Sequence, residues 1–135
     1  MTTPVNELRG IKDETANKLK DLKIKDSDQL LETSKTPAQR KLLAQQIDIT
    51  PQELLRLANS ADLSRIKGVG GAFSDLLEKA GVDTVKELVM RRADNLHTKI
   101  SEINATEGLV KQAPSASQIE AWVAEAKSLP RGLEY

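Results

Sequence analysis

Apolar residues recur every three or four positions along almost the whole chain, and this spacing constrains the possible fold more than any other feature. Such a stripe places apolar side chains on one face of a helix. The clearest stripes are Leu19 and Leu22; Leu42, Leu43 and Ile47; Leu54, Leu55 and Ala58; Phe73, Leu76, Leu77 and Ala80; Leu96, Ile100 and Ile103; and Ile119, Trp122, Val123 and Ala126. No run of β-branched and aromatic residues alternates with a period of two, so strands are not expected. The spacing therefore predicts an all-α fold, a compact bundle of about ten short helices.

Residues that commonly cap helices stand at several of the expected helix starts. Thr36 and Thr50 each lie directly before a proline, a residue that favours the first position of a helix. Ser117 and Glu120 have the spacing of a capping box, and Asp94 is predicted to cap the helix that follows it. Helices as short as these are marginal by themselves, so we expect tertiary packing to hold them in place.

An internal repeat organises the chain. An offset of 58 positions places residues 8–11 on residues 66–69 and residues 30–31 on residues 88–89, with similar residue types at each pair of positions. Each half looks too small to bury its apolar side chains well. We therefore expect two repeats that pack together as one body.

The repeat divides the chain into a first unit of residues 1–60 and a second unit of residues 61–129. Residues 59–64 are expected to join the units through a turn and one helical turn. The register slips after residue 100, which predicts a longer loop over residues 104–114. Residues 130–135 follow the last apolar stripe and are predicted to be a loose tail.

The composition excludes several kinds of functional site. The chain has no cysteine and one histidine, His97, so a disulfide framework, a cysteine-ligated zinc site and a two-histidine metal site are excluded. No nucleophile–base pair stands out, so we expect neither enzymatic activity nor a cofactor. No apolar run is long enough to span a membrane, and the first residues lack the pattern of a secretory signal. These features predict a cytoplasmic protein with no membrane contact.

The charge is balanced both in total and locally. The chain has 20 Lys and Arg against 20 Asp and Glu. Residues 1–60 hold 10 basic and 9 acidic side chains, and residues 61–135 hold 10 and 11. Neither half is therefore a basic nucleic-acid-binding module. With only three aromatic residues there is no base-stacking platform, and we expect Phe73 and Trp122 to be core anchors.

One glycine-rich motif, residues 66–71, carries most of the chemical information. Gly68 and Gly70 permit positive φ angles and a tight reversal of the chain, and Val69 between them is expected to point inward. The next helix would then begin with backbone N–H groups directed outward. Such a helix start attracts anions, because its N–H donors and the helix dipole both favour negative charge.

The motif resembles the helix-hairpin-helix motif of sequence-independent DNA-binding proteins. Gly68, Val69 and Gly70 match the hairpin positions, and Ser74 matches the small residue where the two helices cross. In the first unit Gly10, Ile11 and Ala16 match the same positions, while Lys12 replaces the second glycine. Residues 81–88 are similar to the continuation seen in bacterial tandem hairpin domains of uncharacterised function. The resemblance covers about residues 5–129 and implies a SAM-domain-like fold of two degenerate hairpin units.

The sequence departs from the DNA-binding pattern after each turn. DNA-binding hairpins commonly carry Lys or Arg there, whereas Asp13 and Glu14 follow the first turn and Gly71 follows the second. Asp75 and Glu78 add negative charge to the helix that would face a phosphate. Any attraction for phosphate would therefore come from backbone donors and a few cations.

Two hypotheses for function follow. The first is a non-catalytic module that weakly binds DNA backbone phosphates, without reading sequence, through the hairpin N–H groups. Its candidate residues are Arg65, Lys67, Gly68, Val69 and Gly70, assisted by Gly10 and Lys12. The alternative is a protein–protein interaction or structural module in which the hairpins only pack helices, and the partner is then another protein. The motif favours the first hypothesis, and the neutral charge favours the second.

Overall fold

The computed structural model describes residues 2–135, and this part of the chain is all-α. It contains eight α-helices, one short 3-10 helix and no strand, apart from an isolated bridge between Pro4 and Asp26. The helices are η1 (Val5–Glu7), α1 (Asp13–Asp21), α2 (Ser27–Thr33), α3 (Pro37–Gln46), α4 (Pro51–Leu63), α5 (Gly71–Lys79), α6 (Val85–Val89), α7 (Ala93–Glu107) and α8 (Ala116–Ser128). The predicted fold class is confirmed, with fewer and longer helices than expected.

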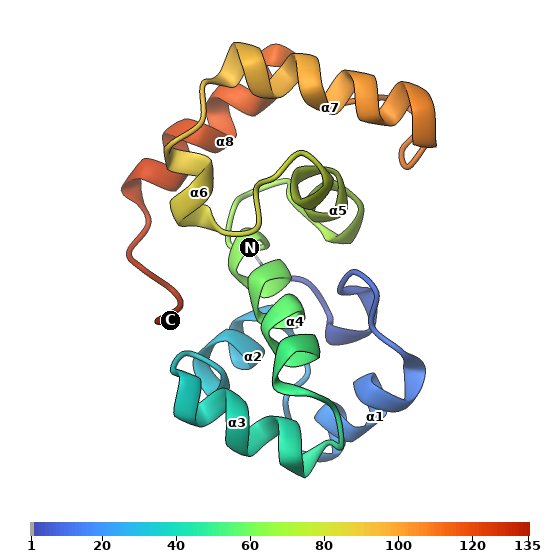
Figure 1. Cartoon of the computed structure of the whole chain (residues 1–135), viewed down its shortest axis with the longest axis vertical. Coiled ribbons are helices and arrows are strands. Elements are labelled where there is room, and N and C mark those ends of the chain that lie inside the picture. The colour runs from blue at the N-terminus through green and yellow to red at the C-terminus, as the bar shows by residue number, and fades with distance from the viewer. Residues whose placement is uncertain (1) are drawn as a thin grey trace.

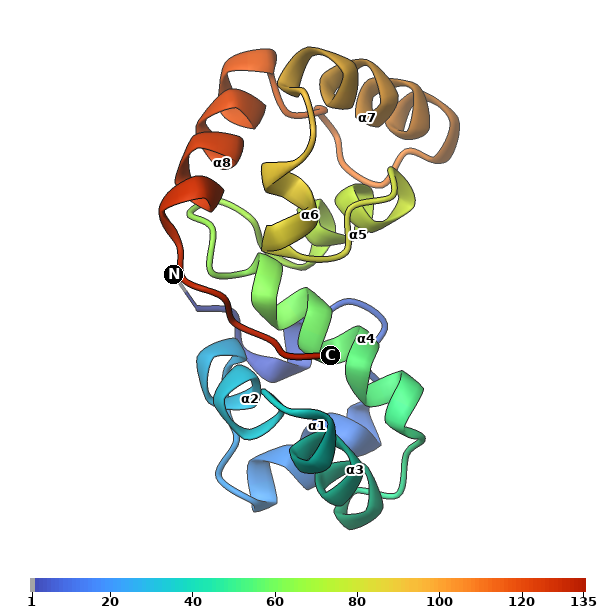
Figure 2. The same cartoon turned by 60° about the vertical axis from the view of Figure 1, so that its left-hand side comes forward.

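The core consists of two hydrophobic clusters. The helices that build them form two groups, α1 to α4 and α5 to α8, which follow one another along the long axis of the molecule (Figures 1 and 2). The first cluster is built by η1, α1, α2, α3 and most of α4, and its fully buried side chains include Leu19, Leu30 and Leu54. The second cluster begins at Leu63 and is built by α5 to α8. We call these two parts the first lobe and the second lobe.

Helix α4 connects the lobes without a break. The sequence predicted a turn at residues 59–64, but these residues form the last turns of α4 and its C-cap, Ser64. The segment holds neither glycine nor proline, so nothing in the backbone stops the helix. Its polar residues have tertiary partners: the Ser60 hydroxyl lies 3.1 Å from the Ser74 hydroxyl of α5. The contact confirms that Ser74 lies where two helices meet.

The helix caps agree with the sequence prediction in the first lobe and differ in the second. Thr36 and Thr50 cap α3 and α4 through their side chains, as predicted. The start of α8 is capped by Ser115, two residues before the predicted Ser117. Helix α7 begins at Ala93, so Asp94 lies inside its first turn and accepts a bond from the amide of Asn95 instead. The error at α8 arises because Ser115 and Ser117 stand close together, whereas α7 begins after Arg92, which makes no side-chain cap bond.

The predicted loop over residues 104–114 is shorter in the structure. Helix α7 continues to Glu107 and ends at Gly108, which has a left-handed conformation with φ of +60°. The Asn104 side chain then binds both backbone groups of Val110, at 3.0 and 3.1 Å, which holds the remaining loop against the helix end.

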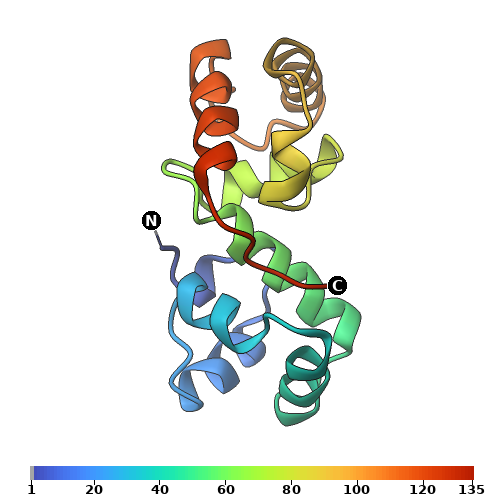
Figure 3. The ribbon, with the colours of Figure 1, turned by 90° about the vertical axis from the view of Figure 1, so that its left-hand side faces the viewer.

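The C-terminal segment, residues 130–135, is packed, whereas the sequence predicted a loose tail. It runs from α8 back across α4 to the first lobe (Figure 3). Leu133 is buried in the first cluster. The Glu134 amide donates to the Lys35 carbonyl at 2.8 Å, and the Glu134 carbonyl accepts a bond from the Arg40 guanidinium at 2.6 Å. Leu133 does not belong to a run of apolar residues at helical spacing. The sequence pattern therefore did not show that it packs in the first cluster.

The two predicted aromatic anchors meet in the second lobe. Trp122 is 5% exposed and Phe73 is half-buried, and their ring centroids lie 5.4 Å apart. Trp122 also lies beneath the glycine turn, because a Cβ at Gly68 would stand 3.7 Å from its indole nitrogen.

Candidate functional site

Two glycine turns of the same construction lie one in each lobe. Gly10 and Gly68 both have positive φ angles, +73° and +87°. In each turn the next residue donates its amide to a carbonyl three residues back: Ile11 to Leu8 at 3.2 Å, and Val69 to Ile66 at 3.1 Å. Val69 is fully buried, as predicted. The second motif glycine, Gly70, has φ of −99° and is the N-cap of α5, so it does not need the left-handed region.

The structure brings the first turn against the start of α5. A Cβ at Gly71 would collide with the backbone carbonyl oxygen of Glu7, directly before the first turn. This close approach explains why a third glycine follows the motif, where the resemblance leads one to expect a basic residue. The sequence offered a signal in the pair Gly70–Gly71, but the partner lies more than 60 positions away.

The cation of the first turn is neutralised by α5. Arg9 forms ion pairs with Asp75 and with Glu78, the latter at 2.9 Å between Nη1 and Oε2. Its side chain is 23% exposed, so the pairs are partly shielded from water. Arg56 of α4 also approaches Glu78, at 3.7 Å. The acidic residues of α5 therefore hold the first turn in place and cancel its positive charge.

The predicted donors of the second turn also have partners within the chain. The Lys67 amide donates to Oε1 of Glu125 in α8 at 3.1 Å, so a carboxylate already occupies this part of the anion site. Arg65 is paired with Asp62 at 2.8 Å and donates to the Pro130 carbonyl at 2.7 Å. Its side chain faces away from the turn, toward the C-terminal segment. Of the two basic side chains in residues 65–71, Lys67 is exposed and Arg65 is half-buried.

The predicted site residues do not gather in one groove. Gly68 and Gly70 line a shallow groove of about 470 Å³ together with Thr2, Pro4 and Ala72. Gly10 and Lys12 line a separate groove of about 240 Å³ that also contains Arg9 and Glu53. Arg65 lines a third hollow, together with residues of α6, α8 and the C-terminal segment. Lys12 is exposed and is the N-cap of α1, whose first turn holds Asp13 and Glu14.

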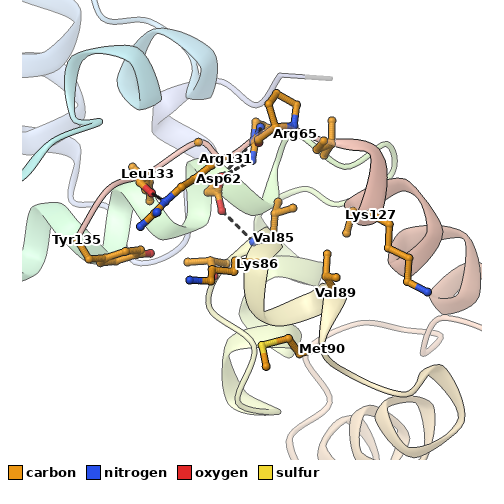
Figure 4. A pocket seen from close by; sticks show the side chains of 15 residues that line it. Asp62, Arg65, Val85, Lys86, Val89, Met90, Lys127, Arg131, Leu133 and Tyr135 are labelled. Carbon is orange, nitrogen blue, oxygen red and sulfur yellow. Dashed lines mark hydrogen bonds and ion pairs between the residues drawn. The ribbon is translucent and has the colours of Figure 1, made fainter.

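The third hollow, which we call the C-terminal cleft, lies between α6, α8 and residues 129–135 (Figure 4). Its volume is about 460 Å³. Asp62 lies at its base and is 3% exposed. One carboxylate oxygen of Asp62 accepts the Val85 amide at the start of α6 at 2.9 Å, and the other accepts Nε of Arg65 at 3.1 Å. The buried carboxylate therefore joins α4, α6 and the C-terminal segment.

The C-terminal segment passes close to this buried carboxylate. A Cβ at Gly132 would collide with Oδ1 of Asp62, so a larger residue there would have to displace the paired Asp62 and Arg65 side chains. The cleft was missed by the sequence reasoning because its walls come from three separate segments of the chain, residues 62–65, 84–90 and 126–135. The local signals are weak: one exposed methionine, Met90, and one glycine, Gly132, in the C-terminal segment.

Tyr135 closes one end of the cleft. Its hydroxyl donates to Oδ1 of Asn59 at 3.0 Å, and the Arg40 guanidinium lies 5.7 Å from the ring centroid. Burial raises the pKa of the Tyr135 phenol, and the carboxylates of Asp62 and Glu87 raise it further. The phenol is therefore a protonated donor at neutral pH, which suits its bond to Asn59.

The described residues supply no arrangement for metal binding. Within residues 2–135, no group of three or more His, Cys, Asp or Glu side chains could hold a metal ion. No helix in the same part of the chain is long and apolar enough to cross a membrane. His97 lies half-buried in the first half of α7.

Comparison with known proteins identifies a family. Residues 9–129 match the family described as a domain of unknown function, DUF4332. This range covers most of the chain, from the first glycine turn to the end of α8, so the chain belongs to this family. No curated protein and no solved structure matches it.

Proposed function

We propose that this member of the DUF4332 family is a non-catalytic protein-interaction module built from two degenerate helix-hairpin-helix units. The assignment of two units is supported by similar helix lengths and backbone angles at positions 58 residues apart. Helices α1 and α5 are both nine residues long and begin at residues 13 and 71. Positive φ angles recur at Gly10 and Gly68, and again at Lys23 and Gly81.

The interaction function rests on one observation: carboxylates of the chain itself already pair with three polar groups at or beside the two turns. Glu125 accepts the Lys67 amide, Asp62 holds Arg65, and α5 neutralises Arg9. A phosphate would have to displace one of these carboxylates. The negative charge of the carboxylate repels an approaching phosphate. The hairpins therefore act as packing elements, which leaves other surfaces of the module for contact with a protein.

A peptide selection tests this function. The immobilised domain, residues 1–135, would be panned against a phage library of random 12-residue peptides. The proposal expects enrichment of a shared motif whose synthetic form binds the domain in solution, since protein-interaction modules recognise short segments by a limited number of modes. Failure to enrich any motif, combined with binding of duplex DNA, would overturn it.

A second candidate, weak DNA backbone binding, is favoured by the start of α5. Gly71, Ala72 and Phe73 bring no acidic side chain into its first turn, and its N-cap Gly70 has no capping side chain. The Lys67 side chain is exposed beside it. Fluorescence anisotropy with labelled duplex and single-stranded DNA tests this candidate. Contact with two to four phosphates gives a log–log salt slope of about −2 to −4, and Lys67→Glu weakens the binding.

A further inference from the structure

The walls of the C-terminal cleft are apolar and open to solvent. Val85 and Ala126 form a buried base, while Val89 and Leu129 are half-buried at the sides. Met90, at the end of α6, is 78% exposed, the highest value among the large hydrophobic side chains of residues 2–135. An exposed flexible thioether beside an apolar hollow is typical of a surface that adapts to a partner.

The rim of the cleft is positively charged. Lys86, Lys127 and Arg131 line it, and all three are exposed without an ion-pair partner within residues 2–135. Figure 4 shows Lys86 and Arg131 beside Tyr135, and Lys127 on the α8 side. Asp62, the acidic side chain among the described residues that line the cleft, is already paired with Arg65 and accepts the Val85 amide. The described lining therefore holds more basic than acidic side chains around an apolar base, with the Glu87 carboxylate near Tyr135 at one end.

We propose that the C-terminal cleft binds an acidic amphipathic segment of a partner protein. The inference rests on the proposed interaction function and names the surface and the chemistry of the partner. Apolar side chains of the segment would lie on Val89, Met90 and Leu129, and its carboxylates would meet the three cations of the rim. An apolar core with a polar rim is the usual anatomy of a recognition surface. Because the rim here is basic, charge complementarity favours an acidic partner.

The cleft is held open by contacts that do not depend on the partner. Asp62 fixes the start of α6 and, through Arg65, the backbone at Pro130. Leu133 anchors the far end of the segment in the first lobe. Because these groups are already paired, the partner would meet a preformed site. Less free energy would then be spent on ordering the cleft when the partner binds.

The test uses two fluorescein-labelled 12-residue peptides that share one pattern of leucines at helical spacing. The remaining positions are Glu and Asp in the acidic peptide, and Lys and Arg in the basic peptide. We expect anisotropy to show the acidic peptide binding the full domain at least about tenfold more tightly than the basic one, with the difference shrinking as salt rises.

Point variants locate the site. Met90→Glu and Lys127→Glu should each weaken binding of the acidic peptide about tenfold, since they place a carboxylate on the exposed apolar surface or on the rim. Leu42→Glu and Lys99→Glu are the matched controls, because both side chains are exposed on other helices and neither lines the cleft. These controls should leave the affinity unchanged, and circular dichroism should show that all four variants are folded.

The outcomes separate this inference from the proposed function. If the acidic peptide does not bind, or binds without sensitivity to Met90 and Lys127, while phage selection yields a ligand that binds elsewhere, the cleft inference fails and the interaction function stands. If neither peptides nor the phage selection give a ligand, both fail. If sedimentation shows a dimer that Met90→Glu dissociates, a second copy of the chain occupies the cleft and the inference is overturned.

Discussion

The two glycine turns share a backbone geometry but differ in what satisfies their polar groups. The first turn reaches across to the other lobe, where Arg9 pairs with Asp75 and Glu78 of α5. The second turn is satisfied within its own lobe, where Glu125 accepts the Lys67 amide. A glycine determines the shape of a turn locally, whereas the packing of distant helices decides whether its donors are available to a ligand.

The largest expected effect comes from the contact between the lobes. Gly71→Ala should destabilise the domain by about 3 kcal/mol, because the new Cβ meets backbone rather than a movable side chain. Gly70→Ala is the matched control: it has no neighbour within 4 Å and a negative φ, so it should change stability by less than about 0.5 kcal/mol. Urea unfolding followed by circular dichroism measures both, and equal values would show that the lobes do not meet at Gly71.

The next prediction compares the left-handed backbone conformation at Gly10 with that at Gly68. Gly10→Ala and Gly68→Ala should each cost about 1–2 kcal/mol, because both positions require the left-handed region and neither has a close neighbour. Thermal unfolding of the two variants gives the comparison. A neutral Gly10→Ala would mean that the first turn adopts another conformation in solution.

A double-mutant cycle measures the ion pair that belongs to the first turn alone. Arg9→Met and Asp75→Asn, singly and together, should give a coupling energy of about 1 kcal/mol at low salt, since the pair is only partly exposed. The coupling should fall in about 1 M NaCl, where surface charges are screened. Additive effects of the two substitutions would contradict a direct contact.

The smallest stability effect is expected at the second turn. Glu125→Gln keeps an oxygen acceptor for the Lys67 amide, so stability should change by less than about 0.5 kcal/mol. Glu125→Ala removes the acceptor and should cost about 1 kcal/mol. Hydrogen exchange of the Lys67 amide is the more sensitive measurement: protection should be retained with Gln and reduced with Ala, and equal protection in both variants would exclude this bond.

The sequence predicted the helical class, the glycine turns and the caps of α3 and α4, because each depends on residues close together in the chain. It also anticipated the burial of Val69 and the helix contact at Ser74. It missed the continuity of α4, since Asn59 and Ser60 look like linker residues until their tertiary partners are known. The packed C-terminal segment was missed for the same reason: Leu133 carries no periodic signal, and its partners lie in the other half of the chain.

The sequence identified the residues of the glycine turns, but it did not show which of them would be exposed, paired or gathered in one groove. Sequence reasoning identified Gly10, Gly68 and Lys67, but it placed Arg65 among the phosphate donors, whereas the structure pairs it with Asp62. Asp62 and Arg65 lie three positions apart, so helical spacing could have indicated this ion pair, whereas the bond from Arg65 to the Pro130 carbonyl, 65 positions away, could not be read from the sequence. The C-terminal cleft depends on such long-range contacts throughout, so it became visible only in three dimensions.

The central claim is that Arg9 at the first turn and the Lys67 amide at the second turn are already paired with carboxylates of the chain, which keeps the turns from binding phosphate. A ¹H–¹⁵N correlation spectrum of the labelled domain, titrated with a short DNA duplex at about 50 mM salt, tests it directly. The account predicts that the amide signals of Gly10, Lys67 and Gly68 stay in place up to a large excess of DNA. Progressive shifts confined to these amides, reversed by added salt, would contradict it and establish the turns as a phosphate-binding site.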